Sequence, residues 1–285
     1  MRISMDLKQM QDPLGLLRLG YAKPLLELQV RRWRDGTVEE RTEPVVEETP
    51  VAVVYNGVPH VVMMATPGDL EDFVLGFSLT EELIRFPADL LSLEIVRYSQ
   101  GIEIQATVSP ECNAVIAGRT RKLTGRTGCG ICGSDSIAVV LKEPRQVPTG
   151  TRIQPTTIQT ALDALTERQA LNAATGAVHA AAWASANGSI ELVREDVGRH
   201  NALDKLIGAA VKQGVDPSTG FVVVTSRASF EMVQKAMILG APLLAAISGP
   251  TGLAVRVAEQ SGMTLVGFAR KDKLTVYTHP DRMVS

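Results

Sequence analysis

A chain of 285 residues with 45% hydrophobic and 21% charged residues is long enough for one large or two ordinary domains and has the composition of a globular protein with a buried core. Its net charge of −2 and its lack of any apolar run of membrane-spanning length argue against a general nucleic-acid binder and a membrane protein. Three cysteines exclude a disulfide scaffold, and residues 1–15 contain no apolar secretory signal, so we expect a cytoplasmic protein.

The N-terminal part of the chain predicts strands and one helix. Residues 24–33 have a strand pattern, and two apolar runs meet at an Asn-Gly turn at positions 56–57, which is the strongest short hairpin signal. Residues 66–84 begin with turn residues and continue with helical spacing of apolar side chains. A second hairpin is predicted over residues 92–108. We therefore expect an α+β subdomain over residues 24–120.

The middle of the chain loses this regular pattern from about residue 117. Residues 121–155 are expected to form a mobile Cys-x-x-Cys loop and a connection, because they contain the glycine-rich stretch GRTGCGICGSDS and end in a segment rich in Pro and Gly. Cys112 precedes this region on a predicted loop or edge and receives no role. Residues 1–23 match no pattern and are expected to form a disordered N-terminal tail.

The C-terminal part alternates helices and strands. One amphipathic helix is predicted over residues 155–176, a hairpin over residues 177–193 and a helix over residues 199–214. Residues 220–269 then read as strand, helix, strand, helix, strand, which predicts a βαβαβ unit with parallel strands. We therefore expect an α/β fold in which residues 156–285 form the second subdomain.

Polar residues follow each of the three predicted parallel strands. Ligands of open α/β sheets bind outside the carboxyl ends of the strands, where helix N–H groups and arginines suit phosphate oxygens. The candidates are Thr225, Ser226 and Arg227; Ser248, Gly249, Pro250 and Thr251; and Phe268, Ala269, Arg270 and Lys271. The competing interpretation is that these residues are ordinary helix caps and turns. No Walker A motif is present and no Gly-x-Gly-x-x-Gly follows a strand, so neither standard phosphate-binding fingerprint applies.

Cys129 and Cys132 form a Cys-x-x-Cys pair among four glycines. A structural zinc site would need a second pair of ligands, and a thioredoxin-like site would start a helix, which glycines disfavour. A sulfur carrier needs mobility, a thiolate and a second thiol that can release the sulfur. The basic residues upstream, Arg121, Lys122 and Arg126, favour the thiolate. These features favour sulfur transfer and leave zinc binding and disulfide exchange as alternatives.

Four other charged or titratable residues are ambiguous in the sequence. His200 is either a proton carrier or a structural residue at the entry to a helix, with the structural role slightly favoured. His179 alternates with small residues on a strand, so it either lines a cavity or lies satisfied in the core. Glu231 and Lys235 have the spacing of a surface ion pair on a helix.

Several long motifs resemble the FdhD family of formate dehydrogenase accessory sulfurtransferases. They are GCGICGSDSI, REDVGRHNALDKLIG, SRASFEMVQKA and TLVGFARKDKLTVYTHP, with TPGDLEDFVLGFSLTEELI near the N-terminus. The resemblance covers the chain from about Pro24 to its end. It implies an enzyme that accepts sulfur as a persulfide from a cysteine desulfurase. The acceptor would be the molybdenum (or tungsten) bis-molybdopterin guanine dinucleotide cofactor that formate dehydrogenase requires.

The resemblance also implies roles for individual residues. Cys129 would carry the persulfide and Cys132 would support its transfer. The cofactor-binding segment of the family falls on Phe268, Ala269, Arg270, Lys271, Asp272 and Lys273. Combined with the strand ends, this predicts that the phosphates of the cofactor, or of GDP as its mimic, lie near Ser226, Arg227, Ser248, Thr251 and Arg270. The metal end of the cofactor would then face the Cys-x-x-Cys loop.

By the same resemblance, the protein is a cytoplasmic homodimer whose C-terminal part is similar to the cytidine deaminase fold. Zinc-dependent deamination is not expected, because the sequence lacks both His-x-Glu and Pro-Cys-x-x-Cys. Two other functions stay open from the residues alone. One is a cofactor chaperone that transfers no sulfur, and the other is a zinc-stabilised nucleotide-binding module.

Overall fold

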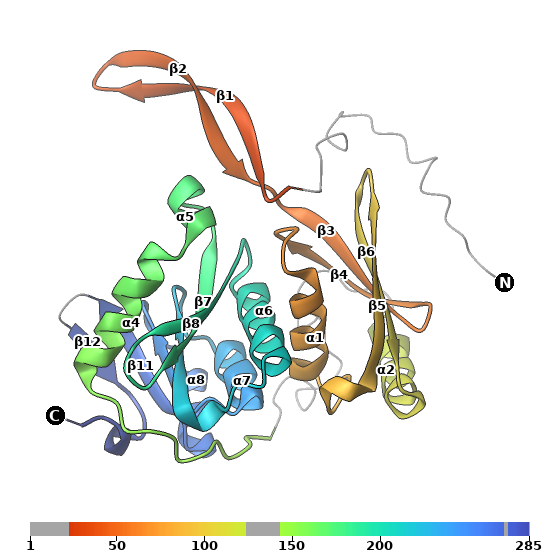
Figure 1. Ribbon diagram of the computed structural model, residues 1–285, viewed down its shortest axis with the longest axis vertical. Coiled ribbons are helices and arrows are strands. Elements are labelled where there is room, and N and C mark those ends of the chain that lie inside the picture. Colours follow the sequence, from red (N-terminus) through yellow and green to blue (C-terminus); the bar gives the residue numbers. More distant parts are fainter. Residues whose placement is uncertain (1–22, 124–142, 271–272, 285) are drawn as a thin grey trace.

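The computed structural model describes residues 23–123, 143–270 and 273–284, which form a mixed α/β structure with three sheets (Figure 1). Cys129, Cys132, Lys271 and Asp272 lie outside the described residues. Among the residues that are described, no helix combines the length and apolar character that a membrane span requires.

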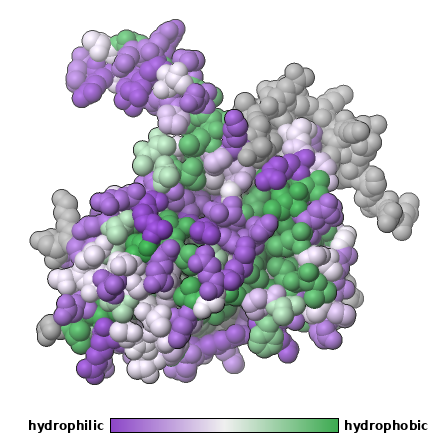
Figure 2. All heavy atoms as spheres, in the orientation of Figure 1, coloured by the Kyte–Doolittle hydropathy of each residue, from purple (hydrophilic) through white to green (hydrophobic). Residues whose placement is uncertain are grey.

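A two-stranded antiparallel ribbon, β1 (Leu25–Arg34) and β2 (Thr37–Val46), extends away from the other elements in Figure 1. Its turn uses Asp35 and Gly36, both with positive φ, which fits the right-handed twist of a hairpin. On the face shown in Figure 2 the ribbon is mainly hydrophilic. The sequence predicted its first strand only.

A four-stranded sheet in the order β4-β3-β6-β5 follows the ribbon. Both predicted hairpins are present, and Asn56 and Gly57 have the positive φ angles that an Asn-Gly turn needs. One face of the sheet packs on two helices in a single core that includes Val53, Phe73 and Ile116. The elements are β3 (Thr49–Tyr55), β4 (Val58–Ala65), β5 (Leu90–Tyr98), β6 (Gly101–Val108), α1 (Leu70–Thr80) and α2 (Pro110–Leu123).

The expectation that Cys112 lies on a loop or edge is wrong. Cys112 is 6% exposed and lies in helix α2, one turn before Ile116, and both side chains join the core of the four-stranded sheet. Val115 is 42% exposed, so the other apolar positions of the helix do not form a regular buried stripe with this pair, and the helical signal in the sequence is weak.

The third sheet has six strands in the order β12-β11-β10-β9-β7-β8. The predicted βαβαβ unit is confirmed, since β9, β10 and β11 pair in parallel with α7 and α8 between them. The strands are β7 (His179–Ser185), β8 (Ile190–Asp196), β9 (Gly220–Val224), β10 (Leu243–Ala246), β11 (Thr264–Arg270) and β12 (Lys273–Val276). The helices are α4 (Pro155–Glu167), α5 (Ala170–Thr175), α6 (Arg199–Lys212), α7 (Phe230–Leu239) and α8 (Gly252–Ser261).

Helices cover both faces of the six-stranded sheet. Val222 and Val224 of β9 face a core with α6, α7 and α8, whereas Phe221 and Val223 face a core with α4. This alternation is what a strand buried on both faces requires. The result is a three-layer arrangement in which the helix termini on one side meet the carboxyl ends of the parallel strands.

The single helix predicted over residues 155–176 is two helices, α4 and α5. The break follows from Glu195 of β8, whose carboxylate accepts hydrogen bonds from the backbone N–H groups of Leu171 (2.9 Å) and Asn172 (2.8 Å). A carboxylate that takes these N–H groups starts a new helix at this point. The predicted end of the pattern at Gly176 is confirmed, with φ of 66° at this residue.

Helices α1 and α6 lie side by side between the two larger sheets (Figure 1). A Cβ atom at Gly76 would overlap the carbonyl oxygen of Asp204, and one at Gly208 would overlap that of Asp72. The helices can approach this closely only because both positions lack a side chain. We call this contact, with the ion pairs around it, the α1–α6 interface.

Candidate functional site

The carboxyl ends of β9, β10 and β11 lie at one edge of the six-stranded sheet, as the sequence predicted. We call it the carboxyl edge. Strand β7 is antiparallel to β9, so its first residue, His179, comes to the same edge. The backbone N–H of Ala180 donates to Thr225 Oγ1 at 2.8 Å and fixes the strands together there. Helices α6 and α7 also begin at this edge.

Three of the predicted phosphate ligands are engaged with the protein itself. Ser226 is 4% exposed and its Oγ donates to the carbonyl oxygen of Arg227 at 3.0 Å. Thr251 Oγ1 accepts a hydrogen bond from the N–H of Ala254 at 3.3 Å and thereby caps α8, as the competing interpretation held. Arg270 Nε donates to the carbonyl oxygen of Ile247 at 3.0 Å. Arg227 is exposed, and within the described chain its side chain has no hydrogen bond or ion pair.

Phe268 is the most unusual residue of the predicted segment. Its φ of 52° lies in the left-handed region, and it is 47% exposed. A bulky aromatic residue rarely adopts this conformation, and strained residues of this kind cluster at functional sites. Its ring packs over Gly249, where a Cβ atom would come within 2.7 Å of it. The surrounding structure therefore holds an aromatic face at the carboxyl edge.

An open pocket of about 320 Å³ lies beside this ring. Its lining consists of Phe268, Arg270, Lys273 and Thr275, and Arg270 pairs in register with Lys273 across β11 and β12. An aromatic ring next to two basic side chains suits a ligand that combines a flat base with phosphate groups.

His200 and Glu231 join the first turns of α6 and α7 at the carboxyl edge. His200 Nε2 lies 2.7 Å from Glu231 Oε2. Burial alone would raise the pKa of Glu231, but His200 and the positive charges of Lys235 and Arg199 outweigh burial and hold this pKa below its usual range. The predicted surface pair of Glu231 with Lys235 is therefore wrong, because Glu231 faces His200.

His179 is half-buried beside this pair. Burial, and then the positive charges of Arg199 and His200, lower its pKa below the usual value. His179 is therefore neutral near pH 7 and able to accept a proton. Among the residues that the structure describes, no three His, Cys, Asp or Glu side chains are grouped as metal ligands.

Lys235 turns inward, toward α1 and α6. It is 8% exposed, and its Nζ donates to both carboxylate oxygens of Asp204 and to Thr80 Oγ1, all at 2.9 Å. Burial would lower the pKa of Lys235, but attraction to Asp204 and Glu81 outweighs burial and raises it. Lys235 thus ties α7 to the α1–α6 interface.

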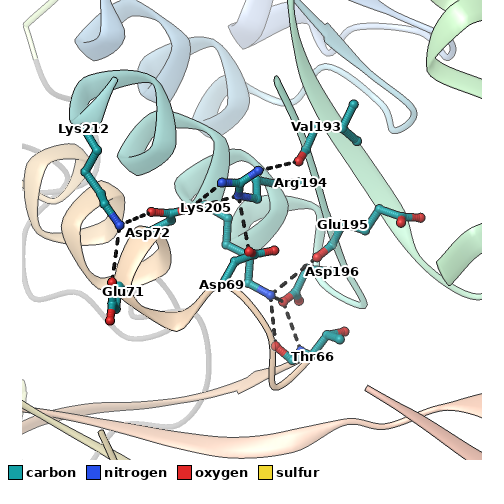
Figure 3. A network of polar contacts seen from close by, with 10 residues as sticks. All are labelled: Thr66, Asp69, Glu71, Asp72, Val193, Arg194, Glu195, Asp196, Lys205 and Lys212. Carbon is teal, nitrogen blue, oxygen red and sulfur yellow. Dashed lines mark hydrogen bonds and ion pairs between the residues drawn. The ribbon is translucent and has the colours of Figure 1, made fainter. Parts of the chain in front are cut away.

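A second network lies at the α1–α6 interface (Figure 3). Lys205 is fully buried, and its Nζ lies 2.7 Å from Asp196 Oδ2 and donates to the carbonyl oxygen of Thr66 at 2.9 Å. Arg194 reaches Asp72 of α1 at 2.6 Å. Buried charges this close to their partners are stable only as pairs. The side chains of the REDVGRHN stretch therefore lie in different places: Arg194 and Asp196 are at the interface, and Arg199 and His200 are at the carboxyl edge.

The chain that follows the Cys-x-x-Cys segment re-enters the structure at the opposite edge of the sheet. The N–H of Arg145 donates to the sulfur of Met237 at 3.0 Å, and the N–H of Val147 donates to the carbonyl oxygen of Ser261 at 2.9 Å. Both acceptors lie near the C-terminal ends of their helices, α7 and α8, which begin at the carboxyl edge. Cys129 and Cys132 themselves are outside the described residues.

Three comparisons with known proteins agree. The profile of the FdhD/NarQ family matches residues 46–284. The sulfur carrier protein FdhD of Xanthomonas euvesicatoria pv. vesicatoria is 52% identical over 254 residues, covering 89% of this chain and 90% of the relative. That of Bordetella petrii is 50% identical over 259 residues, covering 89% and 92%.

Among solved structures, the fold matches a crystal structure from Desulfotalea psychrophila of a protein described as a formate dehydrogenase accessory protein. The TM-score is 0.72 at 25% sequence identity, and the match covers 91% of this chain and 99% of the other. With a family profile over most of its length and relatives at about half identity, the chain belongs to the FdhD/NarQ family.

Proposed function

We propose that this protein is a sulfurtransferase that accepts sulfur as a persulfide from a cysteine desulfurase and transfers it to the bis-molybdopterin guanine dinucleotide cofactor of formate dehydrogenase. The main support is the Cys129 and Cys132 pair in a chain whose relatives at 50–52% identity are named sulfur carrier proteins. The likeness to a protein described as a formate dehydrogenase accessory protein supports the acceptor.

The two thiols supply a balanced route for the sulfur. The Cys129 thiolate attacks the outer sulfur of the donor persulfide, which leaves a thiolate on the donor and a persulfide on Cys129. The Cys132 thiol then attacks Cys129 and closes a disulfide, so that the outer sulfur leaves at the sulfide level. A thiol reductant must reopen the disulfide before the next cycle.

The carboxyl edge is the proposed holder of the acceptor. We place the guanine base of the cofactor, or of GDP, against Phe268, with basic residues of the segment 268–273 beside it. The polar strand ends at Ser226, Arg227, Ser248 and Thr251 complete the crevice, the last through the backbone at the start of α8. The aromatic ring and paired cations of the pocket support this placement.

We further propose two subdomains, residues 24–120 and 156–285, joined by residues 121–155, and a cytidine deaminase-like fold for the second. Separate hydrophobic cores and the three-layer arrangement support this division. A cytoplasmic homodimer completes the proposal. Arg145 and Val147 lie at the edge opposite the crevice, and the length of α7, about 15 Å for its 10 residues, separates the two edges.

Replacing Cys129 with Ala tests the function. Mass spectrometry after incubation with a cysteine desulfurase and cysteine should find one added sulfur on the Cys129 peptide of the wild type and none in Cys129→Ala. The variant should fail to activate formate dehydrogenase but keep its affinity for GDP. Cys112→Ala is the matched control and should keep the added sulfur. Activation by Cys129→Ala would instead indicate a cofactor chaperone, and stoichiometric zinc in the purified protein would favour the zinc-stabilised module.

A further inference from the structure

The ribbon of β1 and β2 receives little support from the rest of the described chain. It forms a two-stranded sheet by itself and extends away from the other elements (Figure 1). Isolated two-stranded hairpins are only marginally stable in water. The cross-strand pair of Trp33 and Val38, close to its turn, is nevertheless 70% and 54% exposed. The profile of the FdhD/NarQ family begins at residue 46, where the ribbon ends, so the family match does not explain the ribbon.

The two edges of the ribbon differ. The backbone N–H of Glu47 donates to the carbonyl oxygen of Pro24 at 2.9 Å, and this bond fixes the alternation of hydrogen bonds along the register. The odd-numbered residues of β1 and the even-numbered residues of β2 therefore direct their N–H and C=O groups outward. On β2 the outward edge contains Pro44, which has no N–H to donate, and this strand lies beside α5. On β1 the outward edge has no proline, and no described strand pairs with it.

Strand β1 is complementary to itself when two copies run antiparallel. A two-fold axis perpendicular to the sheet keeps each side chain on its own face, so two odd-numbered or two even-numbered residues lie opposite each other. An axis at Gln29 places Glu27 opposite Arg31 of the partner subunit, and no other centre on β1 places Glu27 opposite an arginine. Opposite charges directly across from each other stabilise an antiparallel pair. The apolar pairs of the same register are Leu28 with Val30 and Leu25 with Trp33, each formed twice.

The ion pairs within the ribbon leave Glu27 available. Every arginine of the ribbon lies beside an acid of the ribbon, whereas Glu27 is exposed and forms no ion pair with the described residues. Arg31 Nε donates to Glu40 at 3.0 Å, but the arginine side chain is 68% exposed. A guanidinium group has five N–H donors, so Arg31 is able to bind a second carboxylate on its other side.

We propose that the outward edge of β1 pairs with the same edge of a second copy of this chain, which joins the two ribbons in a four-stranded antiparallel sheet. This deepens the homodimer of the proposed function and rests on it for the number of copies. The added strand satisfies the outward backbone groups of β1 in both copies and covers Trp33 with an apolar neighbour. It also supplies the support that an isolated ribbon lacks.

Sedimentation equilibrium of the full chain over a range of concentrations tests the edge. Arg31→Pro removes an outward N–H of β1 in each copy and should raise the dissociation constant of the dimer by about tenfold or more. Glu40→Pro is the matched control, because it changes the other member of the same cross-strand pair and breaks the same ion pair, but on the β2 edge. It should leave the dissociation constant within about twofold. Equal effects of the two prolines would overturn the assignment to β1.

Exchange of charges tests the register. Glu27→Arg and Arg31→Glu each place like charges opposite each other, so each variant alone should dimerise more weakly than the wild type by about tenfold. A mixture of equal amounts of the two variants restores both opposite-charge pairs. Native mass spectrometry of this mixture should therefore find mainly the heterodimer, and a random distribution of the two chains would contradict the register.

The outcomes separate this inference from the proposed function. A dimer that neither Arg31→Pro nor Glu27→Arg weakens would overturn the ribbon contact and leave the homodimer on another surface. A wild type that stays monomeric would overturn both the ribbon contact and the homodimer, and would leave the β1 edge to a strand of another protein. Neither result changes the expected transfer of sulfur to the Cys129 peptide, which is measured separately.

Discussion

Both the α1–α6 interface and the carboxyl edge contain basic side chains, but those at the interface are paired with carboxylates and one at the edge is not. At the interface, Lys205 and Lys235 are buried and bonded to Asp196 and Asp204. At the edge, Arg199 lacks any such partner. A buried charge without a partner costs several kcal/mol, so the buried lysines of the interface need their carboxylates, whereas Arg199 is only partly buried and has no such requirement. The difference separates residues that hold the protein together from residues available to a ligand.

The same contrast divides one stretch of sequence. Residues 194–200 read as one charged motif, but Arg194 and Asp196 serve the interface while Arg199 and His200 serve the edge. Variants of Arg194 and Asp196 should change stability with little effect on ligand affinity, and a variant of Arg199 should do the reverse.

The largest expected effect is that of Lys205→Met. It leaves Asp196 buried and unpaired, and the free energy of unfolding should fall by about 3–5 kcal/mol. Chemical denaturation measures this loss. Lys212→Met removes a cation whose side chain is 45% exposed at the same interface and should cost less than about 1 kcal/mol. Equal losses in the two variants would contradict the importance of burial.

The second largest loss of stability is expected for Gly208→Ala. The new Cβ would overlap the backbone of Asp72, and overpacking of this kind costs about 1–3 kcal/mol. Gly118→Ala on α2 is the matched control, because nothing lies within 4 Å of its new Cβ, and it should stabilise the protein by about 0.5–1 kcal/mol. Thermal unfolding of both variants would show the opposite signs. Stabilisation by Gly208→Ala would contradict the close approach of α1 and α6.

Phe268→Asn should raise the stability of the protein and lower its affinity for GDP. Asparagine tolerates the left-handed region, so the free energy of unfolding should rise by about 0.5–1 kcal/mol while affinity for GDP falls. Denaturation and calorimetry on the same preparation measure both quantities. His279→Asn, at another position with positive φ, should leave GDP affinity unchanged. A Phe268→Asn variant that binds GDP normally would remove the aromatic contact from the proposed site.

An effect of similar size is expected at Glu231. Its pKa is lowered in the folded protein, so its carboxylate stabilises the fold above the unfolded pKa of about 4.3, and this contribution is lost as the pH falls through the folded value. Glu231→Gln should therefore lose about 1 kcal/mol at pH 7, and the gap to the wild type should close on acidification. Glu259→Gln, at an exposed and longer pair with His279, should lose less than about 0.5 kcal/mol at either pH. A stability difference between Glu231→Gln and the wild type that increases in acid would contradict the lowered pKa of Glu231.

Local signals predicted most of the fold. Asn-Gly turns and strand–helix alternation depend on residues close in the chain, and these elements are where the sequence placed them. Helix α2 was not predicted because, among its described side chains, Cys112 and Ile116 alone join the core. The break between α4 and α5 depends on Glu195, a residue from a later strand, and no local pattern reveals it.

The sequence predicted the location of the candidate site, because strand order determines it, but not the hydrogen-bond partners of its residues. Parallel strands fix where Ser226, Thr251 and Phe268 end up, so the carboxyl edge followed from the sequence. Which side chains stay free there depends partly on tertiary partners, such as Glu231 for His200 and the carbonyl oxygen of Ile247 for Arg270.

The glycine contact at Gly76 and Gly208 also limits how this family can be recombined. Each glycine accommodates backbone of the opposite helix, so neither helix has a shape that is independent of the other. A chimera that joins the N-terminal half of one relative to the C-terminal half of another inherits a fitted surface from two different parents. Helices α1 and α6 should be exchanged together, as one cassette, if such hybrids are to fold.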